Sequence, residues 1–265
     1  MTDSRTQLDT SVAHSARLWN YLLGGKDHFA ADREAAEQAL ALMPELIYSA
    51  RADREFLGRA VRYLAGHAGI RQFLDIGTGL PTANNTHEVA QSVAPDSRIV
   101  YVDNDPMVLV HARALLSSTS QGTTDYIEAD VRDPDDIIEA ASNTLDFTQP
   151  VAIMLLGILN FIVDDLEAAT IVQRLIAAVP SGSFLVVSHP TLEVNPAAVR
   201  ESMRLWNDSG AAPITARSPK DISRFFDSVE LLDPGVVSCS HWRPDPAYPG
   251  IEVRVSEYGA VGRKR

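Results

Sequence analysis

The stretch FLDIGTGLPT, Phe73 to Thr82, decides the fold. Its apolar start runs directly into Gly77 and Gly79, which is typical of a buried strand that turns sharply into a loop. Glycine permits such a turn and lets the backbone approach a ligand closely. A third glycine in the spacing Gly-x-Gly-x-x-Gly would complete a dinucleotide-binding loop, but Thr82 occupies that position. The stretch alone leaves open a tight turn and a cofactor loop.

The segments after this loop alternate between strand-like and helix-like patterns. The predicted strands are residues 72–76, 99–102, 125–129, 151–156 and 183–188, and the predicted helices between them are residues 82–92, 106–117, 135–142 and 164–178. This alternation predicts an α/β fold with a mostly parallel, doubly wound sheet. Beyond residue 215 we expect a short helix from Ser218 to Phe226. Two further strands, 229–238 and 251–258, should pair antiparallel at the sheet edge.

The chain before the sheet is predicted to be helical, over residues 12–23, 32–43 and 49–65. We therefore expect an N-terminal helical segment, 1–68, followed by a domain over 69–265. The turn around Gly24 and Gly25 either ends the first helix or belongs to a lid over the ligand. In the lid interpretation, Arg17, Tyr21 or Lys26 would reach the ligand. The arginines of the third helix are expected to face water.

Composition limits the function classes. The 265 residues carry a formal net charge of −12, which argues against nucleic acid or an anionic membrane as the partner. Cys239 is the single cysteine, so an intramolecular disulfide is excluded and a cysteine-based zinc site is not expected. We find no signal-peptide pattern and no apolar run long enough to span a bilayer. We expect a soluble, cytoplasmic protein without a metal, and the oligomeric state stays open.

Acidic residues stand at the ends of the first three predicted strands, where open α/β sheets bind their ligands. These residues are Asp75, Asp103 and Asp130. An acidic side chain after the second strand is well placed to accept hydrogen bonds from ribose hydroxyls. Three carboxylates would repel a pyrophosphate, and the glycine loop offers no Lys or Arg. A ligand with hydroxyls, an amine and a sulfonium, S-adenosylmethionine (SAM), suits this pocket better, although backbone amides can also hold phosphates.

Longer stretches carry a resemblance to a known family. The Asp-x-Gly-x-Gly loop, the acidic end of the second strand and the segment ADVRD resemble class I, Rossmann-like SAM-dependent methyltransferases. HSARLWNYLLGGKDHFAADREAA (14–36), IRQFLDIGTGLPTANNTHEVAQ (70–91) and IVYVDNDPMVLVHARALL (99–116) resemble, more narrowly, a bacterial S-adenosyl methyltransferase family formerly labelled a domain of unknown function. This likeness extends from about residue 12 to the C-terminal YGAVGRK. Pro81, where class I loops often have another glycine, is expected to start the following helix.

The resemblance implies a set of cofactor-binding residues. Gly77 and Gly79 would line the methionine part of SAM, and Asp75 would contact its ammonium. Leu156 and Gly157 would pass under the sulfonium, close to where the methyl acceptor enters.

The nucleoside part of SAM would bind at the next two strand ends. Asp103 would bind the ribose hydroxyls, and Asn104 would lie beside the adenine. Asp130 would accept a hydrogen bond from the adenine amino group, with the backbone of Val131 alongside.

The predicted function is SAM-dependent methyl transfer to an unidentified small-molecule acceptor. Two alternatives stay open: a SAM-binding sensor or partner protein without transferase activity, and a nicotinamide-dependent oxidoreductase, which Thr82 and the acidic pocket disfavour. No catalytic residue is assigned. His189 could act as a general base or be structural. Asn160 could orient the acceptor or cap the helix that starts near Asp164.

Overall fold

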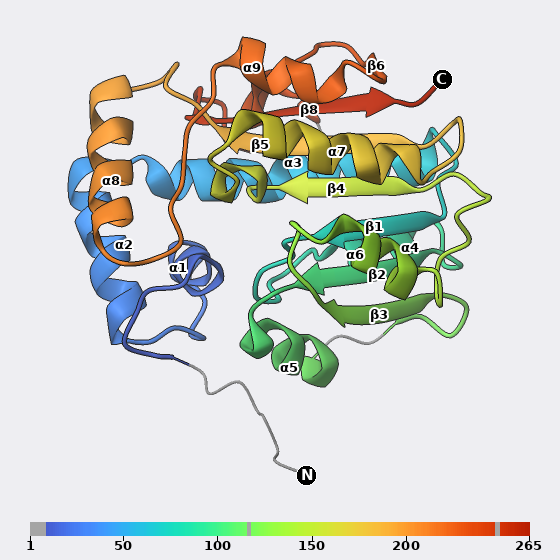
Figure 1. Ribbon diagram of the computed structural model, residues 1–265, viewed down its shortest axis with the longest axis horizontal. Coiled ribbons are helices and arrows are strands. Elements are labelled where there is room, and N and C mark those ends of the chain that lie inside the picture. Colours follow the sequence, from blue (N-terminus) through green and yellow to red (C-terminus); the bar gives the residue numbers. More distant parts are fainter. Residues whose placement is uncertain (1–8, 116–117, 247–249) are drawn as a thin grey trace.

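A computed structural model of the chain describes residues 9–115, 118–246 and 250–265, and its centre is a twisted sheet (Figure 1). The strand order is β3-β2-β1-β4-β5-β8-β6, with β7 paired to β8. The strands are β1 Gln72–Ile76, β2 Arg98–Asp103, β3 Thr123–Glu128, β4 Ala152–Leu156, β5 Phe184–Pro190, β6 Glu230–Leu231, β7 Val237–Ser238 and β8 Glu257–Arg263. β1 to β5 run parallel, whereas β8 is antiparallel to β5. The mostly parallel sheet with an antiparallel C-terminal strand confirms the predicted fold class.

Helices cover both faces of the sheet (Figure 1). They are α1 Ser15–Leu22, α2 Ala30–Leu42, α3 Leu46–Gly66, α4 Thr86–Val93, α5 Pro106–Leu115, α6 Pro134–Ala141, α7 Asp165–Ala177, α8 Pro196–Asp208 and α9 Pro219–Ser223, with 3-10 turns η1 Leu159–Phe161, η2 Arg224–Phe226 and η3 Cys239–His241. Successive residues of a strand point to opposite faces. Accordingly, Leu74 packs in one core cluster with α6 and α7, and Phe73 packs in the other with α3 and α4.

Three helices gather at the carboxyl ends of the parallel strands. Figure 1 shows α1, α2 and α8 at the left of the sheet, on the side to which the arrowhead of β4 points. Leu18 and Leu22 of α1 form a small apolar cluster with Ala36 of α2 and Trp206 of α8. α3 differs from these helices because its apolar face, including Phe56 and Leu64, belongs to the core of the sheet. No helix of the described residues has the length and apolarity to cross a membrane.

The two predicted C-terminal strands are confirmed only in part: β6 and β7 lie within 229–238 and pair antiparallel with β8, but the bounds of both predicted strands are wrong. The segment predicted as strand 229–238 is interrupted at Gly235, which has a positive φ of 83° and whose N–H bonds to Leu232. The segment predicted as strand 251–258 overlaps β8 only at Glu257 and Tyr258, and its residues 251–256 precede the strand. Its backbone is held instead by serine side chains, because the N–H of Val255 donates to Ser238 Oγ and the carbonyl of Val253 accepts from Ser240 Oγ.

Two further expectations about helices are wrong. Pro81 does not start a helix: α4 begins at Thr86, after Asn85, whose N–H donates to Glu88 Oε2 (2.8 Å). The arginines of α3 do not all face water either. Arg54 donates to the backbone carbonyls of Ala83 and Asn84, and Arg59 donates to that of Trp242. α3 is thereby fastened both to the glycine loop region and to the C-terminal segment.

Candidate functional site

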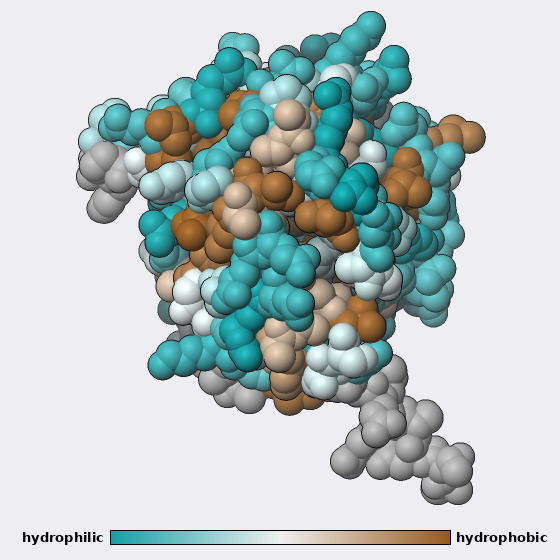
Figure 2. Space-filling model, turned by 90° about the vertical axis from the view of Figure 1, so that its left-hand side faces the viewer, coloured by the Kyte–Doolittle hydropathy of each residue, from teal (hydrophilic) through white to brown (hydrophobic). Residues whose placement is uncertain are grey.

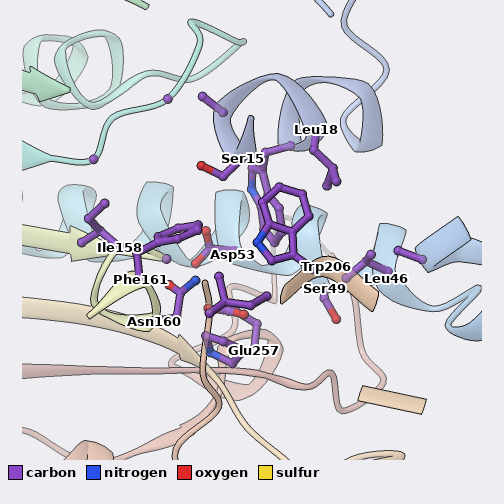
Figure 3. A pocket seen from close by; sticks show the side chains of 18 of the residues that line it. Ser15, Leu18, Leu46, Ser49, Asp53, Ile158, Asn160, Phe161, Trp206 and Glu257 are labelled. Atoms are coloured by element: carbon purple, nitrogen blue, oxygen red, sulfur yellow. The ribbon is translucent and has the colours of Figure 1, made fainter. Parts of the chain in front are cut away.

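A cavity of about 250 Å³ lies where the parallel strands end (Figure 3). Its floor is made by the ends of β1, β2, β4 and β5, and residues of α1, α2, α3 and α8 line its other walls. Figure 2 shows this end of the molecule, where apolar side chains gather at the centre of the face and polar side chains surround them.

Seven of the nine predicted cofactor-binding residues line this cavity: Asp75, Gly77, Gly79, Asp103, Asn104, Leu156 and Gly157. Asp130 and Val131 are not among the lining residues. Asp130 lies next to them, because Asn104 Nδ2 donates to its Oδ2 at 3.2 Å. The side chain of Val131 is buried in the core of the sheet. Most of the residues that were predicted from the strand ends therefore lie together at one cavity.

The carboxylate of Asp103 is held by two backbone N–H groups. Gly79 donates to Oδ2 at 2.8 Å, and Asp105 donates to Oδ1 at 2.9 Å. Burial raises the pKa of Asp103, while these two hydrogen bonds and nearby His14 oppose the rise. A carboxylate has about four acceptor positions, so two of them stay available for ligand hydroxyls.

Asp75 is a second buried carboxyl group at the floor. Thr86 Oγ1 donates to its Oδ2 at 2.6 Å. Burial raises the pKa of Asp75 to about 6, and the hydrogen bond from Thr86 and the charge of Arg54 only partly offset this. The floor is thus acidic and poor in cations, which suits a ligand with an ammonium group.

The glycines leave room for a ligand. At Gly79 and Gly157 the backbone has positive φ values of 66° and 59°, and among the described residues other than the chain neighbours no atom lies within 4 Å of the position that a Cβ would take. At Gly77, by contrast, a Cβ would stand 2.8 Å from Ile158, so the loop after β1 packs directly on the loop after β4. The open position at Gly79, whose N–H donates to Asp103, fits the methionine part and the ribose of SAM.

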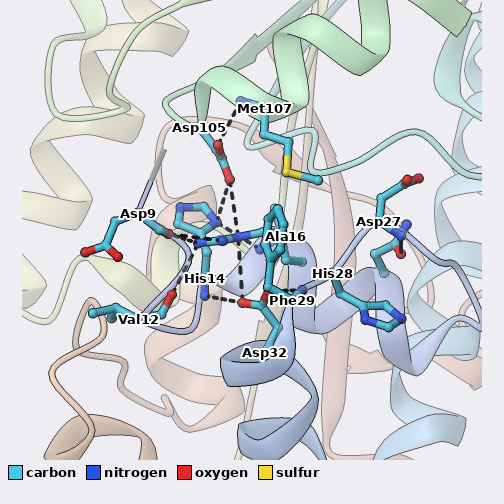
Figure 4. Close-up of polar contacts among 12 residues, drawn as sticks. Asp9, Val12, His14, Ala16, Asp27, His28, Phe29, Asp32, Asp105 and Met107 are labelled. Atoms are coloured by element: carbon cyan, nitrogen blue, oxygen red, sulfur yellow. Dashed lines mark hydrogen bonds and ion pairs between the residues drawn. The ribbon is translucent and has the colours of Figure 1, made fainter. Parts of the chain in front are cut away.

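A buried polar cluster fastens α1 to this floor (Figure 4). Arg17 Nε lies 3.6 Å from Asp32 Oδ1 and 3.9 Å from Asp105 Oδ2, and His14 Nδ1 lies 3.2 Å from Asp105 Oδ2. Asp32 also accepts hydrogen bonds from the N–H groups of His14 and Phe29. The cluster joins α1, the start of α2 and the loop after β2.

The predicted ligand contacts from the N-terminal segment fall on the wrong face of the helix. Arg17 and Tyr21 are not lining residues, nor is Lys26 in the following turn. Arg17 is used in the buried cluster, and Tyr21 Oη donates to Glu37. The residues that do line the cavity are His14, Ser15, Ala16, Leu18 and Trp19.

His189 has no access to the cavity. It is fully buried, with Nδ1 2.8 Å from the carbonyl oxygen of Pro190 and Nε2 2.8 Å from Arg217 Nη1. Burial, together with the smaller effect of the Arg217 charge, lowers the pKa of His189 to about 4. Both ring nitrogens are occupied, so the structural interpretation of His189 holds and the general-base interpretation fails.

Asn160 lines the cavity and does not cap α7. Asp164 is itself the cap, because its Oδ1 accepts from the N–H of Glu167 at 2.8 Å. Two carboxyl groups that sequence reasoning missed, Asp53 and Glu257, line the same part of the cavity. Asp53 could have been found, because it shares the apolar face of its helix with Phe56, Leu57 and Ala60, an unusual place for a carboxylate.

Comparison with known proteins decides the family. The family model described as S-adenosyl methyltransferase matches residues 1–265. The chain belongs to this family. Methyltransferase activity with SAM as the cofactor follows from this membership, and it agrees with the open glycine loop and the buried acidic strand ends.

Two solved structures resemble this methyltransferase along its whole length. A DUF574 family protein from Streptomyces avermitilis is 46% identical, with 97% of this chain and 99% of that chain covered and a TM-score of 0.92. A candidate methyltransferase from Thermobifida fusca is 41% identical, with both chains fully covered and a TM-score of 0.88. A SAM-dependent methyltransferase from Anabaena variabilis, at 15% identity, shares the fold with a TM-score of 0.55 over 88% of this chain and 94% of that chain. No curated protein matches the sequence.

Proposed function

We propose that this methyltransferase transfers the methyl group of SAM to a small-molecule acceptor that binds in the same cavity. The observation that carries the proposal is the continuity of the cavity. It extends from the glycine loop and Asp103, past Leu156 and Gly157, to a chamber lined by Leu46, Leu57 and Trp206. Figure 3 shows Leu46 of α3 and Trp206 of α8 on the same side of this chamber.

The chain's own residues have clear tasks in this proposal. Asp103 would hold the ribose and Asp75 the ammonium, Gly77 and Gly79 would line the methionine part, and the open position at Gly79 would allow its close approach. The sulfonium of SAM supplies an electrophilic methyl group, so the protein needs mainly to position the acceptor and exclude water. The helix-lined chamber supports both tasks, because it is mostly apolar and concave.

The segment before the sheet, predicted as residues 1–68, would cover the chamber through α1 and α2 in this proposal. Support comes from the cavity-lining residues of both helices and from the Arg17 cluster that holds α1 in place. We also propose a cytoplasmic location and an acceptor that is neither nucleic acid nor membrane lipid. The net charge of −12 supports this part.

Calorimetric titration and a transfer assay test the proposal. The protein is titrated with SAM, S-adenosylhomocysteine (SAH) and NAD, and then incubated with SAM labelled in the methyl group and a bacterial extract separated by size. We expect binding of SAM and SAH but not NAD, and label in the small-molecule fraction. Label confined to macromolecules, or binding without any transfer as in a sensor, would contradict the proposal.

A variant that fills the chamber distinguishes binding of the acceptor from binding of SAM. Ser202 of α8 lines the chamber, so Ser202→Trp should abolish transfer while SAM affinity stays unchanged. Arg200→Trp, at an exposed position on the same helix, is the matched control and should transfer normally. Transfer by Ser202→Trp at the wild-type rate would place the acceptor elsewhere.

A further inference from the structure

Three hydrogen-bond acceptor groups converge in the chamber from distant parts of the chain. They are the carboxyl groups of Asp53 on α3 and Glu257 at the start of β8, and the amide oxygen of Asn160 on η1 (Figure 3). Glu257 is paired in register with Pro190, so it stands at the carboxyl end of β5. The side chains of Ser49 and Ser256, 3.4 Å apart, join α3 to the residue before β8.

These groups are buried and partly without partners. The exposed fractions of Asp53, Glu257 and Asn160 are 6%, 5% and 7%. Glu257 Oε1 and Asn160 Oδ1 have no hydrogen-bond partner among the residues that the structure describes. An unsatisfied buried acceptor is costly. A ligand that donates hydrogen bonds at this place would remove that cost.

The pair is acidic, and Arg54, which also lines the cavity, is a cation close to it. Burial raises the pKa of Asp53 to about 6, against the effects of the Ser188 hydroxyl and of Arg54. Burial and the neighbouring Asp53 raise the pKa of Glu257 well above its ordinary value. The guanidinium of Arg54 already donates to the carbonyls of Ala83 and Asn84.

The other titratable groups near the pair do not supply a positive charge. Cys239, whose Sγ lies 4.0 Å from Asp53 Oδ1, is a buried thiol whose pKa is raised well above its ordinary value. Asp75, whose pKa Asp53 helps to raise, adds negative charge from the floor. Neighbouring carboxyl groups disfavour each other's ionisation, and the pair carries negative charge whenever Asp53 is ionised.

We propose that the methyl acceptor carries a basic amine, and that Asp53, Glu257 and the amide oxygen of Asn160 hold this amine for methylation. The inference rests on the proposed function and names its acceptor class. An ammonium group has three N–H donors and one positive charge, which match the three acceptors and the acidic character of the pair. A hydroxyl group has one donor and no charge, so it would leave two acceptors and the charge unmatched.

The acidic pair can also accept the proton that the ammonium group must lose before methylation. The ammonium group passes one proton to the ionised carboxylate of the pair, which frees the nitrogen lone pair. The nitrogen then bonds to the methyl carbon of SAM while the carbon–sulfur bond breaks, and the electrons of that bond stay on sulfur. The positive charge thereby moves from sulfur to the methylated nitrogen. The carboxyl group releases its proton to solvent when the product leaves.

Matched probes test the amine preference. SAH-loaded protein is titrated with 2-phenylethylamine against 2-phenylethanol, and with tryptamine against tryptophol, and thermal shift and calorimetry are recorded. We expect each amine to bind more tightly than its alcohol by about 10-fold or more, since hydrogen bonds to charged groups have that strength. Equal responses within both pairs, including no response to any probe, would overturn the proposal.

Charge-neutralising variants locate the binding groups. Glu257→Gln and Asp53→Asn keep the side-chain shape, and each should weaken amine binding about 10- to 100-fold while alcohol and SAH affinities stay unchanged. Glu252→Gln, at an exposed position, is the matched control. Wild-type amine affinity in either folded variant would overturn the assignment of that carboxyl group.

Failure of this inference differs from failure of the proposed function. If SAH binds and labelled methyl groups reach only alcohols, the acceptor class is wrong and the methyltransferase proposal stands. If SAM and SAH do not bind in the first place, the proposed function itself fails.

Discussion

The backbone N–H of Gly79 donates a hydrogen bond to Asp103 Oδ2, with 2.8 Å between nitrogen and oxygen. This bond links the loop after β1 to the end of β2, and Asp105 fixes the other oxygen of the same carboxylate. The ligand-facing groups of two strands are therefore oriented before any ligand arrives. Such preorganisation reduces the entropy lost on binding.

Asp103→Asn should weaken SAM binding by about 1–3 kcal/mol, because the ribose loses hydrogen bonds to a charged group. Calorimetry with SAM and SAH measures this effect. Asp136→Asn, at an exposed position on α6, is the control. Equal SAM affinity in the Asp103 variant and the wild type would remove Asp103 from the binding site.

Asp75→Asn should raise the stability of the ligand-free protein at pH 7 and lower its SAM affinity. The folded pKa of Asp75 is about 6, above the ordinary value of 3.8, so burying the charged form costs stability above pH 6 and this cost disappears as the pH falls towards 4. The shift corresponds to at most about 3 kcal/mol of unfolding free energy at pH 7.

Urea unfolding of wild type and Asp75→Asn at pH 7 and pH 4 measures this difference. The free energy of unfolding of Asp75→Asn should exceed that of the wild type at pH 7 and nearly equal it at pH 4. A variant less stable than wild type at pH 7 would show that the carboxylate is stabilising in its ionised form.

Arg17→Ala should lower the free energy of unfolding by about 3–5 kcal/mol, because it leaves the buried carboxylate of Asp32 without its cationic partner and leaves Asp105 with His14 alone. SAM affinity should fall as well, since α1 loses its attachment to the loop after β2. Thermal unfolding and calorimetry measure the two effects. Arg62→Ala, on the exposed face of α3, should leave both unchanged, and an equally harmless Arg17→Ala would contradict the role of the cluster.

His189→Gln should change the pH dependence of stability without changing SAM affinity. The folded pKa of His189 is about 4, below the ordinary value of 6.5, so the neutral ring stabilises the fold above pH 6.5, and this contribution is lost as the pH falls towards 4. The stability difference between wild type and variant should shrink by about 2 kcal/mol between pH 6.5 and pH 5. A difference that stays constant over this range would contradict the buried neutral histidine.

The central part of the fold could be predicted because its strands are buried on both faces. VAIMLL, residues 151–156, is an uninterrupted apolar run, and β4 is found within it. β8 gave no such signal because it contains Gly259 and Gly262. A Cβ at Gly259 would lie 2.7 Å from the ring of Phe56, so glycine is needed here for the packing of α3 on the sheet. Because glycine has a low strand propensity, the pattern of the sequence did not indicate a strand.

α8 was missed although a signal exists. Val199, Met203 and Trp206 recur at helical spacing in PAAVRESMRLWND, and Pro196 stands at the first turn. It follows β5, the last parallel strand, and therefore lies outside the strand–helix–strand alternation that guided the prediction.

The sequence predicted the cofactor-binding strand ends but not the acidic residues of the chamber. The strand ends follow a general rule of parallel sheets, so Asp75 and Asp103 could be placed together. Asp53 and Glu257 could not, because they meet only through the packing of α3 against β8, which no local pattern describes.

The position of β8 has a consequence for biosynthesis. When β5 has just emerged from the ribosome, all five parallel strands are outside, but β8, the second neighbour of β5, has not yet been made. During that interval the nascent sheet has an open, apolar edge at β5, which is a hazard for aggregation. The chamber also lacks Glu257 until β8 is made. A nascent chain could therefore acquire its glycine loop early in translation, whereas its complete acceptor chamber can form only after the antiparallel strand has emerged.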